Sequence, residues 1–216
     1  MAPMSLFTSD VFALLDSGRI EFSGLSAIQY GGDGFLIKQL GSVYDKNLQR
    51  PLAIGCALMK KALVDKFTLR AQLSIGDSAD VSGTYSESMQ KRIREKSNSS
   101  YLGFSAGGRF SNMLFNTVIG TSIFNAYRLQ QPKGPLFVVD RLLATDLQKT
   151  GVAIREHDAG LLIDWLHYDH EYVRSAMNAL GIDDSFNYRD ALVKYIDKHR
   201  AYLPPDWKTS AEALVA

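Results

Sequence analysis

The segment QYGGDGFLI places one carboxylate, Asp33, among three glycines and between two apolar runs. Two roles are open for this residue. An aspartate in a glycine-rich turn favours the turn by bonding to its own backbone. A carboxylate is also the ligand that hard divalent cations select. Taken by itself, the segment favours the turn interpretation over the metal ligand.

A second group of chemically useful residues lies in IGTSIFNAYRL, where Asn125 and Arg128 stand three positions apart. Helical spacing puts both on one face of a helix. An arginine fork matches phosphate geometry and stabilises the charge that develops during phosphoryl transfer. The ordinary alternatives are an arginine that favours the helix dipole and an asparagine that bonds locally near a helix start. Other residues are needed to decide between these roles.

The remaining reactive side chains favour structural roles. His167, Asp169 and His170 lie close together in HYDHE, but no further cluster completes a metal site, so surface or packing roles are favoured. The one cysteine, Cys56, lies in the apolar stretch LAIGCALM and cannot form a disulfide within the chain. We expect it to be buried as a small hydrophobe.

Composition is that of an ordinary soluble globular chain. The 216 residues are 46% hydrophobic and 22% charged, and the formal net charge is +1. This balance gives no electrostatic sign of a nucleic-acid or anionic-membrane partner. No run approaches the roughly 20 apolar residues that span a bilayer, and the N-terminus has no secretory pattern. We therefore expect a cytoplasmic protein that binds neither nucleic acid nor membrane.

The elements that must position these residues alternate between strands and helices. Apolar runs at 19–30 and 35–40 predict a β-hairpin with Asp33 near its tip. Helical spacing predicts helices at 5–17, 50–67, 121–131 and within 169–200, where GIDDSFN is a break. In the helix at 50–67 the lysines are expected opposite the apolar face. Strands are expected within 68–86 and 107–120, at the start of 134–147, and after a turn within 155–168.

Two further stretches are polar. Residues 87–100 predict a solvated helix or mobile loop, and YLPPDW predicts the end of regular structure, followed by a loose tail. The order of elements favours an α+β sheet with helices on one face. We expect one domain over residues 1–168 and a helical extension and tail over 169–216.

Three segments in this order resemble the class III nucleotidyl cyclases, the catalytic domain of adenylate and guanylate cyclases. QYGGDGFLI is similar to the family's strand-turn-strand hairpin, and LRAQLSIGDSADVSG to its next strand motif through Arg70, Gly76 and Gly83. FNTVIGTSIFNAYRL is similar to its Ile-Gly-x-x-Val-Asn-x-Ala-x-Arg-Leu pattern, matched by Ile119, Gly120, Ala126, Arg128 and Leu129. The resemblance covers roughly residues 1–168.

The resemblance implies a ferredoxin-like α+β fold that dimerises head to tail, with active sites between the subunits. It implies a reaction that joins the ribose 3′-oxygen of a nucleoside triphosphate to its own α-phosphate. Two divalent cations, Mn²⁺ or Mg²⁺, would lower the pKa of the hydroxyl and neutralise the leaving group. Asp33 matches a metal-binding aspartate and Arg128 the transition-state arginine, so here the resemblance favours the metal role for Asp33.

Two family positions are not matched. The family's other metal-binding aspartate has no counterpart among the 32 residues before Asp33. Either the native protein has an upstream segment, which we expect, or the chain is a degenerate cyclase-like domain. Phe124 stands where the family has its ribose-orienting asparagine, and Asn125 follows one position later on the face of Arg128. Asn125 is therefore the candidate for orienting the ribose.

The base-contacting positions match neither the adenine nor the guanine pattern. They hold Gln29 and Thr121, and the neighbouring ring of Tyr30 would shorten the pocket. A short pocket with amide and hydroxyl groups suits a pyrimidine, as in the pyrimidine cyclases of bacterial Pycsar anti-phage systems, which this pattern resembles. We expect UTP to be favoured over CTP and the cyclic product to be read by a separate effector. The candidate substrate-binding residues are Tyr30, Gln29, Thr121, Phe124 and, toward the triphosphate, Arg155. The alternatives are a purine cyclase with unusual base contacts and a catalytically inactive regulatory domain.

Overall fold

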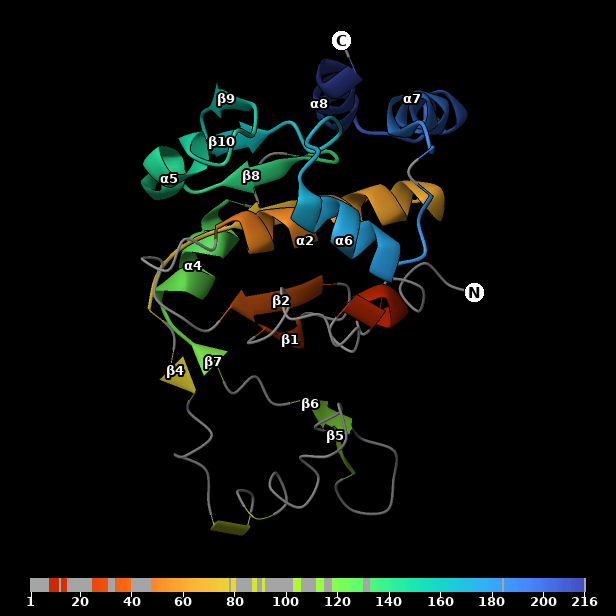
Figure 1. The fold of residues 1–216 in the computed structure, drawn as a ribbon. Helices are drawn as coiled ribbons and strands as arrows, with labels where there is room; N and C mark the ends of the chain where they lie inside the picture. The colour runs from red at the N-terminus through yellow and green to blue at the C-terminus, as the bar shows by residue number, and fades with distance from the viewer. Residues whose placement is uncertain are drawn as a thin grey trace. The chain divides into compact units, whose positions relative to one another are not determined.

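The computed structural model divides the chain into two compact units, one of residues 1–75 and 125–216 and one of residues 76–124. The residues that it describes are 8–11, 13–14, 25–30, 34–39, 48–77, 79–80, 87–88, 91, 103–105, 112–114, 118–129, 133–183 and 185–215. They combine helices with short strands (Figure 1), so the predicted α+β class is confirmed. None of the described helices is long and apolar enough to cross a membrane.

The first unit contains a mixed four-stranded sheet. Its order is β3 (Ala71–Leu73), β8 (Phe137–Val139), β10 (Gly160–Ile163) and β9 (Ile154–His157). β3 runs parallel to β8, whereas β10 is antiparallel to both of its neighbours. All three residues of β8 are buried, as a continuous apolar run predicts for an inner strand.

The predicted hairpin is confirmed. β1 (Leu25–Tyr30) and β2 (Gly34–Gln39) pair antiparallel, from Leu25 opposite Gln39 to Tyr30 opposite Gly34. The register leaves residues 31–33 as the connection between the strands. Asp33 belongs to this connection and lies outside the described residues.

Helix α2 (Gln49–Val64) confirms the helix expected at 50–67 and packs against the sheet. At Gly55, a Cβ atom would lie 2.5 Å from Cε1 of Phe137, so the glycine allows α2 to approach the aromatic ring of β8 closely. Within the unit, α2 also contacts α6 (Glu171–Ala179) and α7 (Tyr188–His199). Residues 8–11 and 13–14 are helical too, in agreement with the helix expected at 5–17.

The C-terminal region corrects two expectations. The predicted loose tail is wrong, because α8 (Pro205–Val215) is a helix with Ala211 fully buried. A proline fits the first position of a helix, where its fixed φ is favourable and no amide donor is needed. The turn and last strand expected within 155–168 are confirmed at residues 158–159 and in β10, but the turn begins later than expected, because Arg155 and Glu156 lie in strand β9 and pair with β10. Between β8 and β9, the chain forms the short helices η3 (Arg141–Leu143) and α5 (Ala144–Gln148).

The second unit is described in short pieces. β4 (Ala79–Asp80) pairs with β7 (Val118–Ile119), and β5 (Gly103–Ser105) pairs with β6 (Asn112–Leu114). The single strand expected within 107–120 is therefore two short strands with different partners. Helix α4 (Thr121–Arg128) follows β7 and confirms the helix expected at 121–131.

Candidate nucleotide-binding site

The start of α4 is where two of the family-like segments meet. The Asp77 amide donates to Thr121 Oγ1 at 3.0 Å. In return, the Ser122 hydroxyl and amide donate to the Asp77 carbonyl at 3.2 and 3.3 Å. These hydrogen bonds satisfy groups that a helix end leaves without intrahelical partners. The first turn of α4 is therefore fixed by a segment more than forty residues earlier in the chain.

Gly76 makes this junction sterically possible. A Cβ atom at this position would lie 2.5 Å from the Ser122 nitrogen and 2.6 Å from Thr121 Oγ1. Both atoms take part in the junction, so neither can move away without breaking a hydrogen bond. The glycine of SIGDSAD thus has a physical role in this chain, independent of the family motif that it matches.

Asn125 is held by a second backbone contact. Its side-chain nitrogen donates to the Ile75 carbonyl at 3.1 Å, and the side chain is half-buried. The amide oxygen then remains the group that Asn125 can offer to a ligand as an acceptor. Arg128 is exposed and lies three residues further along α4, on the same helix face. α4 therefore carries one acceptor and one guanidinium in neighbouring positions.

Thr121 and Phe124 were expected to contact the substrate. Thr121 is exposed, but its oxygen already accepts from Asp77, which leaves its hydroxyl hydrogen as the group for a ligand. Phe124 is 62% exposed, as is Tyr127 on the same helix. Contact of either residue with a base or ribose stays a prediction.

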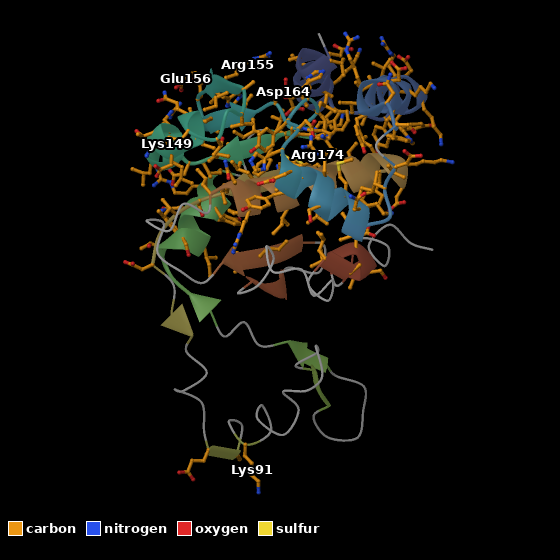
Figure 2. All side chains as sticks on the ribbon, viewed as in Figure 1. Lys91, Lys149, Arg155, Glu156, Asp164 and Arg174 are labelled. Atoms are coloured by element: carbon orange, nitrogen blue, oxygen red, sulfur yellow. The ribbon has the colours of Figure 1, made fainter. Side chains whose placement is uncertain are left out.

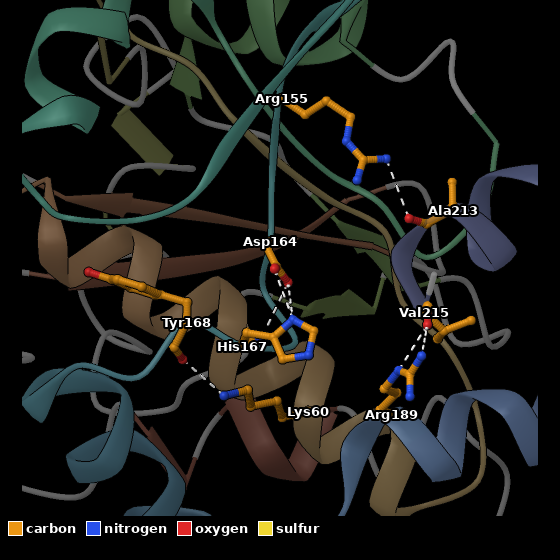
Figure 3. A network of polar contacts seen from close by, with 8 residues as sticks. All are labelled: Lys60, Arg155, Asp164, His167, Tyr168, Arg189, Ala213 and Val215. Carbon is orange, nitrogen blue, oxygen red and sulfur yellow. Dashed lines mark hydrogen bonds and ion pairs between the residues drawn. The ribbon is translucent and has the colours of Figure 1, made fainter.

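Arg155 lies on β9 and is exposed (Figure 2). Its Nη1 donates to the Ala213 carbonyl of α8 at 3.4 Å (Figure 3). Sequence reasoning missed this partner, because it treated the segment that carries Ala213 as a tail. The proposed contact of Arg155 with a triphosphate stays a prediction.

The base-contacting hairpin is described in its backbone. Gln29 stands opposite Phe35 and Tyr30 opposite Gly34, so the two candidates end the strand that leads to Asp33. The side chains of Gln29 and Tyr30 lie outside the described residues, as does Asp33. The contacts of these three residues stay predictions.

The histidines of HYDHE have separate local partners. His167 Nδ1 lies 2.8 Å from an Asp164 carboxylate oxygen, Asp169 pairs with Arg174 at 2.7 Å, and His170 accepts from the Tyr172 amide at the start of α6. These contacts agree with the expected surface and packing roles. Within the part of the chain that the structure describes, no three His, Cys, Asp or Glu side chains group as a metal site would require. The described side chains therefore provide no ligand set against which Mn²⁺ or Mg²⁺ can be fitted.

Lys60 is the charged residue that sequence reasoning placed wrongly. It was expected on the solvated side of α2, but it is only 5% exposed. Its Nζ donates to the Tyr168 carbonyl at 3.0 Å and lies 5.1 Å from the ring centroid of Tyr188. Burial lowers the pKa of this ammonium group. A signal was present, because Lys60 stands four residues after Cys56 and so shares its apolar face.

The site that these residues form can bind an anion and orient a hydroxyl. Arg128 supplies a positive fork, and Asn125 supplies an acceptor whose orientation the Ile75 carbonyl fixes. Comparison with known proteins adds nothing to this geometry: no protein-family model, no curated protein and no solved structure matches the chain.

Proposed function

We propose that this chain is a nucleotidyl cyclase with the ferredoxin-like class III fold that converts a pyrimidine nucleoside triphosphate to its 3′,5′-cyclic monophosphate and pyrophosphate. UTP is favoured over CTP. The supporting observation is the junction of Asp77 with Thr121 and Ser122, which joins two family-like segments at the start of the helix that carries Asn125 and Arg128. As in the anti-phage systems that it resembles, the enzyme would act in the cytoplasm and its product would be read by a separate effector.

In the proposed reaction the ribose 3′-oxygen bonds to the α-phosphorus and the bond from that phosphorus to the bridging oxygen breaks. Pyrophosphate leaves, and the proton of the hydroxyl passes to solvent. Arg128 stabilises the negative charge on the α-phosphate. Asn125 accepts from a ribose hydroxyl through its amide oxygen, while its amide nitrogen donates to the Ile75 carbonyl. Gln29, Tyr30, Thr121 and Phe124 are the candidates for contact with the base and ribose, and Arg155 is the candidate for contact with the triphosphate.

Two features of the proposal depend on groups beyond the described residues. Two divalent cations, Mn²⁺ or Mg²⁺, belong to it, with Asp33 as the candidate ligand on this chain. The proposal also includes a homodimer with active sites between the subunits. The second subunit then provides another copy of each residue at the interface. The roles given above to Arg128 and Asn125 are derived without the cations.

The test is incubation with each of the four ribonucleoside triphosphates in the presence of Mn²⁺, with cyclic products separated by mass. We expect cyclic UMP to exceed cyclic CMP. Arg128→Ala should lower turnover by about 10²–10³-fold, because it removes one donor to the transition state. The matched control is Arg200→Ala, an exposed arginine near the end of α7 that pairs with Asp197 at 3.2 Å, and it should leave turnover unchanged.

Three results would contradict the proposal in different ways. Dominant cyclic AMP or GMP would show a purine cyclase instead. An absence of product with every triphosphate, together with ligand binding that Asp33→Ala leaves intact, would show a regulatory domain. Equal turnover in the Arg128 variant and its control would remove the catalytic role of that arginine.

A further inference from the structure

Helix α8 is held at both of its ends by charged side chains from other elements. Near its start, Lys133 Nζ lies 3.3 Å from an Asp206 carboxylate oxygen. Near its end, Arg189 of α7 donates to the Val215 carbonyl through Nε, at 2.8 Å, and through Nη2. Arg155 of β9 donates to the Ala213 carbonyl at 3.4 Å. Figure 3 shows both arginines directed at the last turn of α8.

The chemistry of these contacts explains why two arginines meet there. The last carbonyls of a helix lack intrahelical partners and carry a partial negative charge. A guanidinium satisfies them, but a neutral carbonyl is a weaker partner for it than an anionic phosphate oxygen. The Arg155 contact is also longer than the Arg189 contact, and it uses one nitrogen whereas Arg189 donates through two. Arg155 is therefore the contact that a phosphate anion can exchange most easily.

Apolar contacts of α8 reach a buried cluster next to the end of α4. Leu214 packs against a buried cluster of Leu129, Leu136 and Val138. Leu129 directly follows Arg128 in the chain. Leu162, which stands opposite Arg155 in the β9–β10 register, packs against the same cluster. The end of α8 thus contacts Arg155 through its backbone, and through Leu214 it packs against the apolar cluster to which Leu129 belongs.

We propose that α8 is a self-docking helix. Its last turn occupies Arg155, and a polyphosphate anion displaces the helix from this arginine. Docking of the last turn of α8 and binding of a triphosphate then compete for the guanidinium of Arg155. Because coupling between two sites is reciprocal, the docked helix lowers the affinity of the chain for the triphosphate, and the triphosphate loosens the helix. The inference rests on the proposed function in one respect, which is the assignment of Arg155 to the triphosphate.

The experiment is hydrogen–deuterium exchange of residues 205–215 in the full chain, with and without inorganic tripolyphosphate. We expect the anion to speed exchange in α8 by about two- to tenfold, the range that corresponds to loss of one ordinary hydrogen bond. In Arg155→Ala, exchange should start faster and should not respond to the anion. Arg155 is exposed on an outer strand of the sheet, so its replacement removes no core packing.

Arg189→Ala is the matched control, because it removes the neighbouring contact with α8 and leaves Arg155 in place. Exchange in α8 should start faster in this variant and should still respond to tripolyphosphate. The proposal is overturned if the parent chain does not bind tripolyphosphate by calorimetry, or binds it without a change in α8. A response of Arg155→Ala equal to that of the parent would also overturn it.

The outcome separates this inference from the proposed function. If tripolyphosphate loosens α8 through Arg155 and no triphosphate is cyclised, the self-docking helix stands and the cyclase proposal fails. If cyclic product forms while α8 exchange ignores both the anion and Arg155→Ala, the cyclase proposal stands and the self-docking helix fails.

Discussion

Cys56 provides a test of the packing around α2 whose size follows from the structure. The residue is fully buried, and burial raises the pKa of its thiol from an ordinary 9.0 to about 12. The unfolded chain can therefore release this proton at a pH where the folded chain retains it. Stability is lost as the pH rises through 9.0, because ionisation then favours only the unfolded state. At about pH 10.5 the loss amounts to about 2 kcal/mol, since 1.5 pH units at about 1.4 kcal/mol each separate that pH from 9.0.

The assay is urea denaturation of the parent and of Cys56→Ala at about pH 7.5 and about pH 10.5. Removal of the side chain lowers stability at both values through lost packing, and this cost does not depend on pH. The difference in free energy of unfolding between the two proteins should therefore shift by about 2 kcal/mol in favour of the variant at the higher pH. Lys60 and Tyr168 also have shifted pKa values, and burial, the largest cause of both shifts, is present in both proteins. A shift below about 0.5 kcal/mol would show that Cys56 is reached by solvent and that α2 packs less closely than described.

Three further predictions concern the junction, the N-terminal helix and the core. Gly76→Ala places a Cβ atom 2.5 Å from the Ser122 nitrogen, so the free energy of unfolding should fall by about 1–3 kcal/mol in urea; an unchanged value would refute the close approach. Burial raises the pKa of Asp10, so its charge costs stability as the pH rises through 3.8. The free energy of unfolding of Asp10→Asn should equal that of the parent at about pH 3 and exceed it at about pH 7. The opposite order would contradict burial as the cause of the raised pKa. Trp165→Phe removes the donor that bonds the Pro135 carbonyl at 2.8 Å, and thermal denaturation should show a loss of about 1–3 kcal/mol unless that carbonyl finds another donor.

The fold was predictable where a local pattern decides the structure. The hairpin of β1 and β2 follows from two apolar runs around a glycine turn, and α6 and α7 follow from helical spacing on both sides of GIDDSFN. Strand β9 was missed because residues 155–157 are polar, and only pairing with β10 makes them a strand. Helix α8 escapes prediction because the two prolines of YLPPDW indicate the end of regular structure, although the second proline is compatible with the first turn of a helix.

The candidate site was less predictable, for a reason that its contacts share. Asn125 bonds to the Ile75 carbonyl, Thr121 to the Asp77 amide, Arg155 to the Ala213 carbonyl and Lys60 to the Tyr168 carbonyl. These partners are 50, 44, 58 and 108 residues away in the chain. Each partner group belongs to the main chain, which nearly every residue type provides equally. Motif matching finds the side chain but carries no signal for such a partner. Substitution at Ile75 or Ala213 would keep the hydrogen bond as long as the backbone keeps its path. Gly76 differs, because the close approach of the backbone leaves no room for a side chain there. At Gly76, therefore, the residue type itself specifies the site.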